Sequence, residues 1–213
     1  MGSYISDRWP QLLSASWQHF SLVTQCLLLA TVLAIIIAAL CYRNKILSEL
    51  ANSVSAVGLT IPSFALIGLM IAPLGFGVAP AVVVVTFYCL LPILRNALVG
   101  LAGVDRSLVE AARGIGMSST TTFFKVELPI AWPVILAGMR VSAQMTMGVA
   151  AISAYVLGPG LGSFIFSGLS RMGGANSLEA VLTAVIAVAL IALILDGLLL
   201  LLGRLTISRG IRA

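Results

Sequence analysis

Long apolar stretches separated by short polar ones dominate this chain of 213 residues. Residues 20–42 carry no charged side chain, and none occurs between Glu49 and Arg95. A helix of about 20 apolar residues is long enough to cross the hydrocarbon core of a bilayer. The second run is too long for one crossing, and the cluster Pro73-Leu74-Gly75-Phe76-Gly77 is a turn signal that divides it. The pattern therefore predicts five transmembrane helices, at residues 20–42, 50–72, 78–98, 131–157 and 180–202.

Composition supports an all-α integral membrane protein. Hydrophobic residues make up 60% of the chain and charged residues only 9%. In a soluble globular domain, about a quarter of all residues are charged. The mean hydropathy is +1.13. The formal net charge of +5 does not indicate nucleic-acid binding, because the cations are not gathered on a soluble face.

The distribution of Lys and Arg predicts the orientation. Cations follow the first, third and fifth predicted spans, at Arg43, Lys45, Arg106, Arg113, Lys125, Arg204, Arg209 and Arg212. The opposite side carries only Arg8 and Arg171. Because Lys and Arg favour the cytoplasmic side, we expect an external N-terminal segment at 1–17 and a cytoplasmic tail at 204–213. The sequence thus predicts a multi-pass protein with its N-terminus outside and its C-terminus in the cytoplasm.

Two segments between the predicted spans have a character of their own. The glycine-rich segment 158–179 is too short to cross, and we expect it to form an external re-entrant segment. The loop 100–130 is cytoplasmic in this orientation and carries helix signals. Asp105 can cap a helix that Gly114-Ile115-Gly116 stops, and Ser118 or Ser119 can cap a second one. By these signals alone, a docking surface for a cytosolic partner and a plain connecting loop remain equally open.

The order of residues in this loop changes that balance. It reads Glu110-Ala111-Ala112, three residues, Gly116, nine residues, Val126-Glu127-Leu128-Pro129. This resembles the EAA loop of type I ABC importer permeases, E-A-A-x3-G-x9-I-x-L-P, with Val126 in place of Ile. The resemblance implies the type I permease fold over residues 18–203. It also implies a coupling surface that seats in an ATP-hydrolysing subunit, formed by Glu110, Ala111, Ala112, Gly116, Val126, Leu128 and Pro129.

Further segments resemble one branch of these permeases. They are "LTIPSFALIGL" (59–69), "LPILRNALVGLAGVD" (91–105), "VELPIAWPVILAGMR" (126–140) and "GPGLGSFIFSGL" (158–169). The branch imports osmoprotectants, which implies a quaternary amine such as glycine betaine, carnitine or choline as the solute. The alternatives are a permease for another small solute such as an amino acid, or a self-contained channel or secondary transporter. The last class leaves the loop pattern unexplained.

The resemblance also implies the partners. The chain has no GxxxxGK[ST] phosphate loop, so we expect a non-catalytic subunit without cofactor, with ATP and Mg bound by a partner. The expected assembly has two cytosolic ABC ATPase subunits, a second permease subunit, identical or homologous, and a separate extracytoplasmic substrate-binding protein, since the chain ends at Ala213. Alternating access in the bacterial plasma membrane is the implied mechanism. Cys26, Cys41 and Cys89 have no metal-ligand spacing, and no metal site is predicted.

A few residues inside the predicted spans need a separate explanation. Pro62 interrupts the second span and Ser63 can satisfy freed backbone groups, so a pathway hinge and a static kink are equally open. Arg140 is costly in hydrocarbon, and Asp196 is its candidate partner. We favour a structurally paired cation over a pore contact for Arg140.

Aromatic faces attract quaternary amines, which draws attention to four residues. These are Phe64, Phe87, Tyr88 and Tyr155. Ordinary packing is the favoured interpretation for each, and the resemblance places the discriminating aromatic cage in the binding protein.

Overall fold

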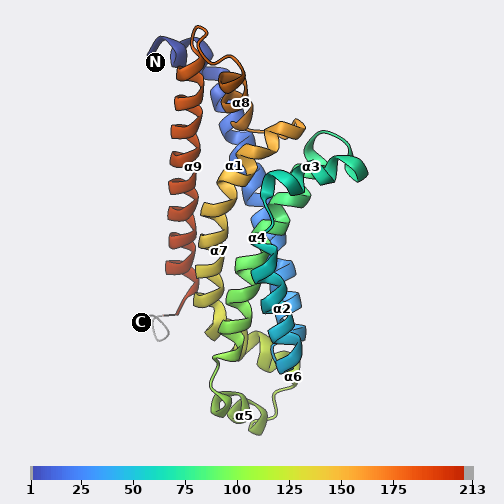
Figure 1. Cartoon of the computed structure of the whole chain (residues 1–213). Coiled ribbons are helices and arrows are strands. Elements are labelled where there is room, and N and C mark those ends of the chain that lie inside the picture. The colour runs from blue at the N-terminus through green and yellow to red at the C-terminus, as the bar shows by residue number, and fades with distance from the viewer. Residues whose placement is uncertain (1, 209–213) are drawn as a thin grey trace.

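A computed structural model describes residues 2–208, and over this part the chain forms helices and no strand (Figure 1). The elements are α1 (Gly2–Cys41), α2 (Lys45–Gly58), α3 (Ser63–Leu74), α4 (Val78–Ala102), α5 (Arg106–Gly114), α6 (Ser119–Thr122), a π-helical turn η1 (Phe123–Glu127), α7 (Leu128–Ile152), a 3-10 turn η2 (Ser153–Val156), α8 (Gly162–Ser170) and α9 (Ser177–Thr206). Of the predicted tail, residues 209–213 lie outside the described residues, as does Met1.

The predicted helix count holds in a modified form. Four helical stretches, which contain α1, α4, α7 and α9, are long and apolar enough to cross a membrane. The pair α2 and α3 passes the same test only jointly, and its two halves are bent by 97°. Taken as one broken span, this pair gives the fifth crossing.

Two helices extend well beyond the ranges that hydropathy assigned. Residues 2–17, expected to form a segment of their own, continue α1, whose 40 residues correspond to about 60 Å. The fourth predicted span began at residue 131, but one continuous helical stretch runs over Ser119–Val156. Pro129 does not end it: it follows directly on the π-helical turn η1, where the Leu128 N–H bonds to the Phe123 carbonyl, and is the second residue of α7.

The second predicted span differs most from its expectation. Residues 50–72 do not form one kinked helix, because α2 ends at Gly58 and α3 begins at Ser63. Pro62 is the N-cap residue of α3. A proline disfavours the helical conformation of the residue before it, which is Ile61 here. The Tyr88 hydroxyl on α4 donates a hydrogen bond to the Ile61 carbonyl inside this break. The break is therefore fixed by a neighbouring helix as well as by proline.

Small residues allow the membrane helices to pack closely, as is typical in a bilayer. α4 packs against both α1 and α7. Ala30, Ala34 and Ala38 on α1 are fully buried. At Gly138 of α7, a Cβ atom would lie 2.7 Å from the Asn96 side chain on α4. α9 lies along α7 and α8 and leaves many of its leucines exposed, as a lipid-facing helix does.

Candidate functional site

The predicted coupling loop forms a short helix, α5, at one end of the molecule (Figure 1). As predicted, Asp105 is its N-cap residue, and a carboxylate oxygen accepts a hydrogen bond from the Ser107 N–H at 2.9 Å. This bond holds the pKa of Asp105 below its usual value. Ser118, rather than Ser119, caps α6 by accepting from the Thr121 N–H at 3.2 Å.

The helix α5 ends in a glycine turn, as the sequence predicted. Gly116 has φ +87°, a conformation that is costly for residues with a Cβ atom. Its N–H donates to the Arg113 carbonyl at 2.9 Å, and the Met117 N–H donates to the Ala112 carbonyl at 3.1 Å. No atom lies within 4 Å of a Cβ added at Gly116, so the backbone conformation, and not space, requires glycine there.

The outer face of α5 is an apolar stripe, which we define as Leu108, Ala111 and Ile115. Leu108 is 47% exposed, Ile115 is 77% exposed, and Ala111 is exposed. Spacings of three and four residues place them on the same side of a helix. Ala112 is buried instead. Of the two alanines in the predicted coupling surface, only Ala111 is therefore exposed.

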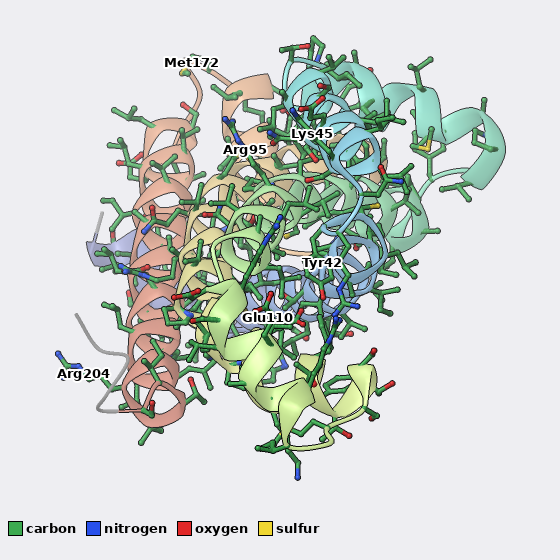
Figure 2. The ribbon with its side chains drawn as sticks, turned by 90° about the horizontal axis from the view of Figure 1, so that it is seen from below. Tyr42, Lys45, Arg95, Glu110, Met172 and Arg204 are labelled. Atoms are coloured by element: carbon green, nitrogen blue, oxygen red, sulfur yellow. The ribbon has the colours of Figure 1, made fainter. Side chains whose placement is uncertain are left out.

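A hollow of about 350 Å³ separates the inner face of α5 from the helix ends above it. Glu110, Arg106 and Arg113 line it from α5, and Tyr42 and Glu127 line it from the body. Figure 2 looks onto this end, with α5 nearest the viewer and Tyr42 and Glu110 labelled. The main contacts of α5 are with α6 and η1. Besides its chain connection to α4, α5 is therefore joined to the membrane helices through α6 and η1.

Glu127 connects η1 to the end of α1. It is 2% exposed, and its carboxylate accepts one hydrogen bond from the Tyr42 hydroxyl and one from Arg43 Nη2, the latter at 2.9 Å. Arg43 Nε also donates to the Tyr42 hydroxyl oxygen at 2.6 Å. Burial, together with the hydrogen bond to the Glu127 carboxylate, raises the pKa of Tyr42 to about 12. We call these three residues the Glu127 cluster.

The structure divides the predicted coupling residues into two groups. Glu110 and Ala111 are exposed on α5, and Gly116 follows its end. Val126 and Leu128 lie half-buried in η1 and at the start of α7, where Leu128 packs against the core. Pro129 is exposed on the first turn of α7. The first group is presented outward, and the second anchors the loop to the membrane helices.

The Glu127 cluster was not predicted. A carboxylate in the variable position between Val126 and Leu128 is a weak signal, because its partners lie 84 and 85 residues earlier in the chain. The cations Arg43 and Lys45 entered the sequence analysis only as orientation signals. Lys45 instead lies 4.0 Å from Glu49 in an exposed pair on α2.

The suggested pairing of Arg140 with Asp196 is present. Arg140 Nε and Nη2 donate to the two carboxylate oxygens of Asp196, at 2.7 and 2.9 Å. The pair joins α7 to α9, and its side chains are 35% and 17% exposed. A bidentate geometry of this kind supports the structural interpretation of Arg140; a contact with the solute stays a prediction.

Pro62 and Ser63 lie at the junction of α2 and α3, and α3 lies toward the end opposite α5 (Figure 1). Their pathway role also stays a prediction. Within residues 2–208, no group of three or more His, Cys, Asp or Glu side chains is arranged to hold a metal ion.

Several curated proteins are similar to this sequence over nearly its whole length. The osmoprotectant import permease protein OsmW of Salmonella typhimurium is 37% identical, covering 98% of each chain. The carnitine transport permease protein OpuCB of Listeria monocytogenes is 33% identical, over 91% of this chain and 87% of its own. The glycine betaine/carnitine/choline transport system permease protein OpuCB of Bacillus subtilis is 33% identical, over 100% of this chain and 96% of its own.

The fold is also found in a solved structure. A chain of the inward-facing MetNI methionine ABC transporter superposes with a TM-score of 0.72 at 21% identity, over 95% of this chain and 96% of that one. The sequence profile of binding-protein-dependent transport system inner membrane components matches residues 30–207. The chain therefore belongs to the family of binding-protein-dependent transport system inner membrane components, as a multi-pass subunit with the type I ABC importer permease fold.

Proposed function

We propose that this chain is a permease subunit of an ATP-driven importer of osmoprotectants such as glycine betaine, carnitine or choline. The names of relatives that are 33–37% identical over most of the chain support the solute class. The proposed assembly contains two ATPase subunits, a second permease subunit and a separate substrate-binding protein. ATP and Mg are bound by the ATPase, and this chain catalyses no reaction.

The presentation of α5 carries the proposal. The helix exposes its apolar stripe, and beyond the glycine turn α6, η1 and α7 continue as one unbroken helical stretch. An exposed apolar stripe on a helix is the form that docks into a groove of a partner protein. A rigid connection behind the stripe is what a transmitted movement requires.

The mechanism follows from these connections. Closure of the ATPase pair displaces α5, and η1 passes the displacement along α7. The Glu127 cluster applies the same displacement to the end of α1, so two helices with different directions in the membrane move together. The bidentate pair of Arg140 and Asp196 makes α9 follow α7. The junction at Pro62 is the proposed hinge that opens or closes the solute pathway.

An exposed residue of the stripe offers the direct test. Ile115→Ser removes an apolar side chain that would be buried in the ATPase, and burial of such a side chain is worth about 1.5–3 kcal/mol. We expect roughly a tenfold or greater loss of co-purifying ATPase and a matching loss of ATP-dependent glycine betaine uptake. Leu205→Ser is the matched control, because Leu205 is 76% exposed in the last turn of α9 and lies outside the loop.

The dependence of uptake on the ATPase is a second test of the proposed function. Uptake has to stop when the ATPase subunit is omitted from the vesicles. Uptake that continues without the ATPase, or an Ile115→Ser complex that assembles and transports normally, would contradict the proposed function.

A further inference from the structure

Three aromatic rings from three separate elements meet on the side of the molecule opposite α5. Phe64 begins α3, Tyr155 lies in η2, and Phe166 lies in α8. The ring centroids of Phe64 and Tyr155 are 4.7 Å apart, and those of Tyr155 and Phe166 are 6.3 Å apart. The rings are tilted by 50° and 48°. We call Phe64, Tyr155 and Phe166 the aromatic cluster.

Two of the three rings keep about half of their surface exposed. Phe64 is 48% exposed and Tyr155 is 51% exposed, whereas Phe166 is half-buried. Rings recruited only for core packing are expected to lose most of their exposed surface. Phe87 and Tyr88, the other two aromatic candidates, do become part of the packed interior: Tyr88 is 4% exposed, and Phe87 is half-buried against the core.

The backbone beneath Tyr155 is held rigidly. The Gly77 N–H donates to the Val156 carbonyl at 2.7 Å, and the Gly158 N–H donates to the Ser153 carbonyl at 2.9 Å. Leu157 adopts φ 61° although it is not glycine. Backbone conformations of this kind persist where the surroundings enforce them, often at functional sites. The Tyr155 ring is therefore held in a fixed position between α3 and α8. Both of these helices contact η2.

The elements that carry the three rings offer no carboxylate to a ligand. The segments of α3, η2 and α8 contain no Asp or Glu, so a cation would be attracted by ring faces and not by a carboxylate. Ring faces favour quaternary ammonium groups, which cannot donate hydrogen bonds and are weakly hydrated. The attraction is modest, and a site along a transport pathway has to release its solute.

We propose that the aromatic cluster is a low-affinity site for a quaternary ammonium group on the permease itself. The proposal rests on the proposed function for its choice of solute and adds a location to it. The site lies beside Pro62 and Ser63, because Phe64 follows them directly in the chain. A movement of the α2–α3 junction would therefore separate Phe64 from Tyr155 and dismantle the site, releasing the solute.

Direct binding to the permease–ATPase complex, purified without the binding protein, tests the site. The two probes are choline and 3,3-dimethylbutan-1-ol, which has the same shape but carries no charge. For the wild-type complex we expect choline to bind more tightly than the alcohol by roughly two- to fivefold, the size of an exposed cation–π contact. Tyr155→Leu and Phe64→Leu should each abolish this preference.

Two variants control for changes in folding. Tyr155→Phe retains a ring face and should retain the preference for choline. Phe76→Leu removes an exposed phenylalanine that takes part in no ring contact among residues 2–208, and it should behave as wild type. If a variant assembles poorly, a second series is used instead, in which position 155 carries a phenylalanine with one, two or three ring fluorines. Progressive fluorination should weaken choline binding stepwise while the shape stays nearly constant.

The possible results separate this proposal from the proposed function. Absence of choline binding to the wild-type complex, equal binding of the two probes, or an unchanged preference in Tyr155→Leu would overturn the aromatic site. ATP-dependent uptake of choline or glycine betaine by the wild-type transporter, with its binding protein, is measured separately. If uptake occurs but the wild-type complex shows no preference for choline over the alcohol, only the aromatic site is contradicted. If uptake fails, the proposed function is contradicted.

Discussion

Glu127 shows how one buried carboxylate can determine the position of a loop. The Glu127 side chain is 3% exposed, whereas that of its partner Arg43 is 47% exposed. A buried charge is costly unless it is paired and hydrogen-bonded, and here Tyr42 and Arg43 supply both conditions. The cluster holds η1 against the end of α1, and η1 carries α5. One residue thus connects a predicted membrane helix to the loop that we propose contacts the ATPase.

Replacing this carboxylate by an amide of the same shape tests the connection. Glu127→Gln leaves an acceptor for Tyr42 but removes the charge that attracts Arg43, and hydrogen bonds to charged groups exceed neutral ones by about 1 kcal/mol. We expect a loss of about 1 kcal/mol in the free energy of unfolding, measured by denaturation in mixed micelles. Glu49→Gln makes the same change in an exposed pair and should fall within experimental error. Equal losses in the two variants would show that Glu127 has no special role.

At the scale of elements, α5 is a short amphipathic helix with well-defined ends. Asp105 caps its beginning, and the turn at Gly116 ends it. Gly114 and Gly116 lie two residues apart but serve different purposes. Gly116 has a positive φ, whereas Gly114 is the last residue of the helix and has no such requirement.

The two glycines therefore make a matched pair of substitutions. Gly116→Ala forces a Cβ atom into a left-handed conformation at a cost of about 1–2 kcal/mol, so the turn should rearrange and move the stripe. We expect less ATPase to co-purify with this variant and ATP-dependent uptake to fall. Gly114→Ala adds the same methyl group where nothing lies within 4 Å and should assemble and transport normally. A Gly116→Ala complex with normal assembly would show that the turn does not control docking.

At the scale of the whole molecule, charge and shape agree on two distinct ends. Arg43 lines one hollow with Arg106 and Arg113 of α5, and the N-terminal part of α1 lies toward the end of the molecule opposite α5 (Figure 1). The positive-inside rule assigns the end with α5 to the cytoplasm. This assignment is a prerequisite of the proposed function, because an ATPase in the cytoplasm cannot reach a loop on the other side.

Labelling of single cysteines from one side of the membrane checks the orientation. In a Cys41→Ala background, Thr120→Cys in α6 should react only when a membrane-impermeant thiol reagent has access to the cytoplasm. Met172→Cys, after α8, should react from the outside, because Met172 is 61% exposed. The remaining cysteines, Cys26 and Cys89, are buried, so the Cys41→Ala protein without an introduced cysteine should not react. Reaction of Thr120→Cys from the outside would exclude docking of α5 to a cytosolic ATPase.

Much of the candidate site could be predicted because its signals are local. The N-caps Asp105 and Ser118 and the turn at Gly116 satisfy backbone groups no more than five residues away, so the residues concerned are neighbours in the sequence. The partners of Glu127 could not be predicted in this way. Their contact depends on how α1 and η1 are rotated and how far each extends, and the pattern of apolar residues constrains neither quantity.

The sequence alone determined that this protein crosses the membrane several times and carries a helical loop with the EAA pattern, because span length is set by bilayer thickness and the loop by local capping. Tertiary structure decided which side of α5 faces outward and that the interruption marked by Pro62 becomes a 97° break between α2 and α3. Tyr88 on α4 fixes that break, and η2 gathers Phe64, Tyr155 and Phe166. Those contacts join residues far apart in the sequence, and only the packing of helices against one another selects them.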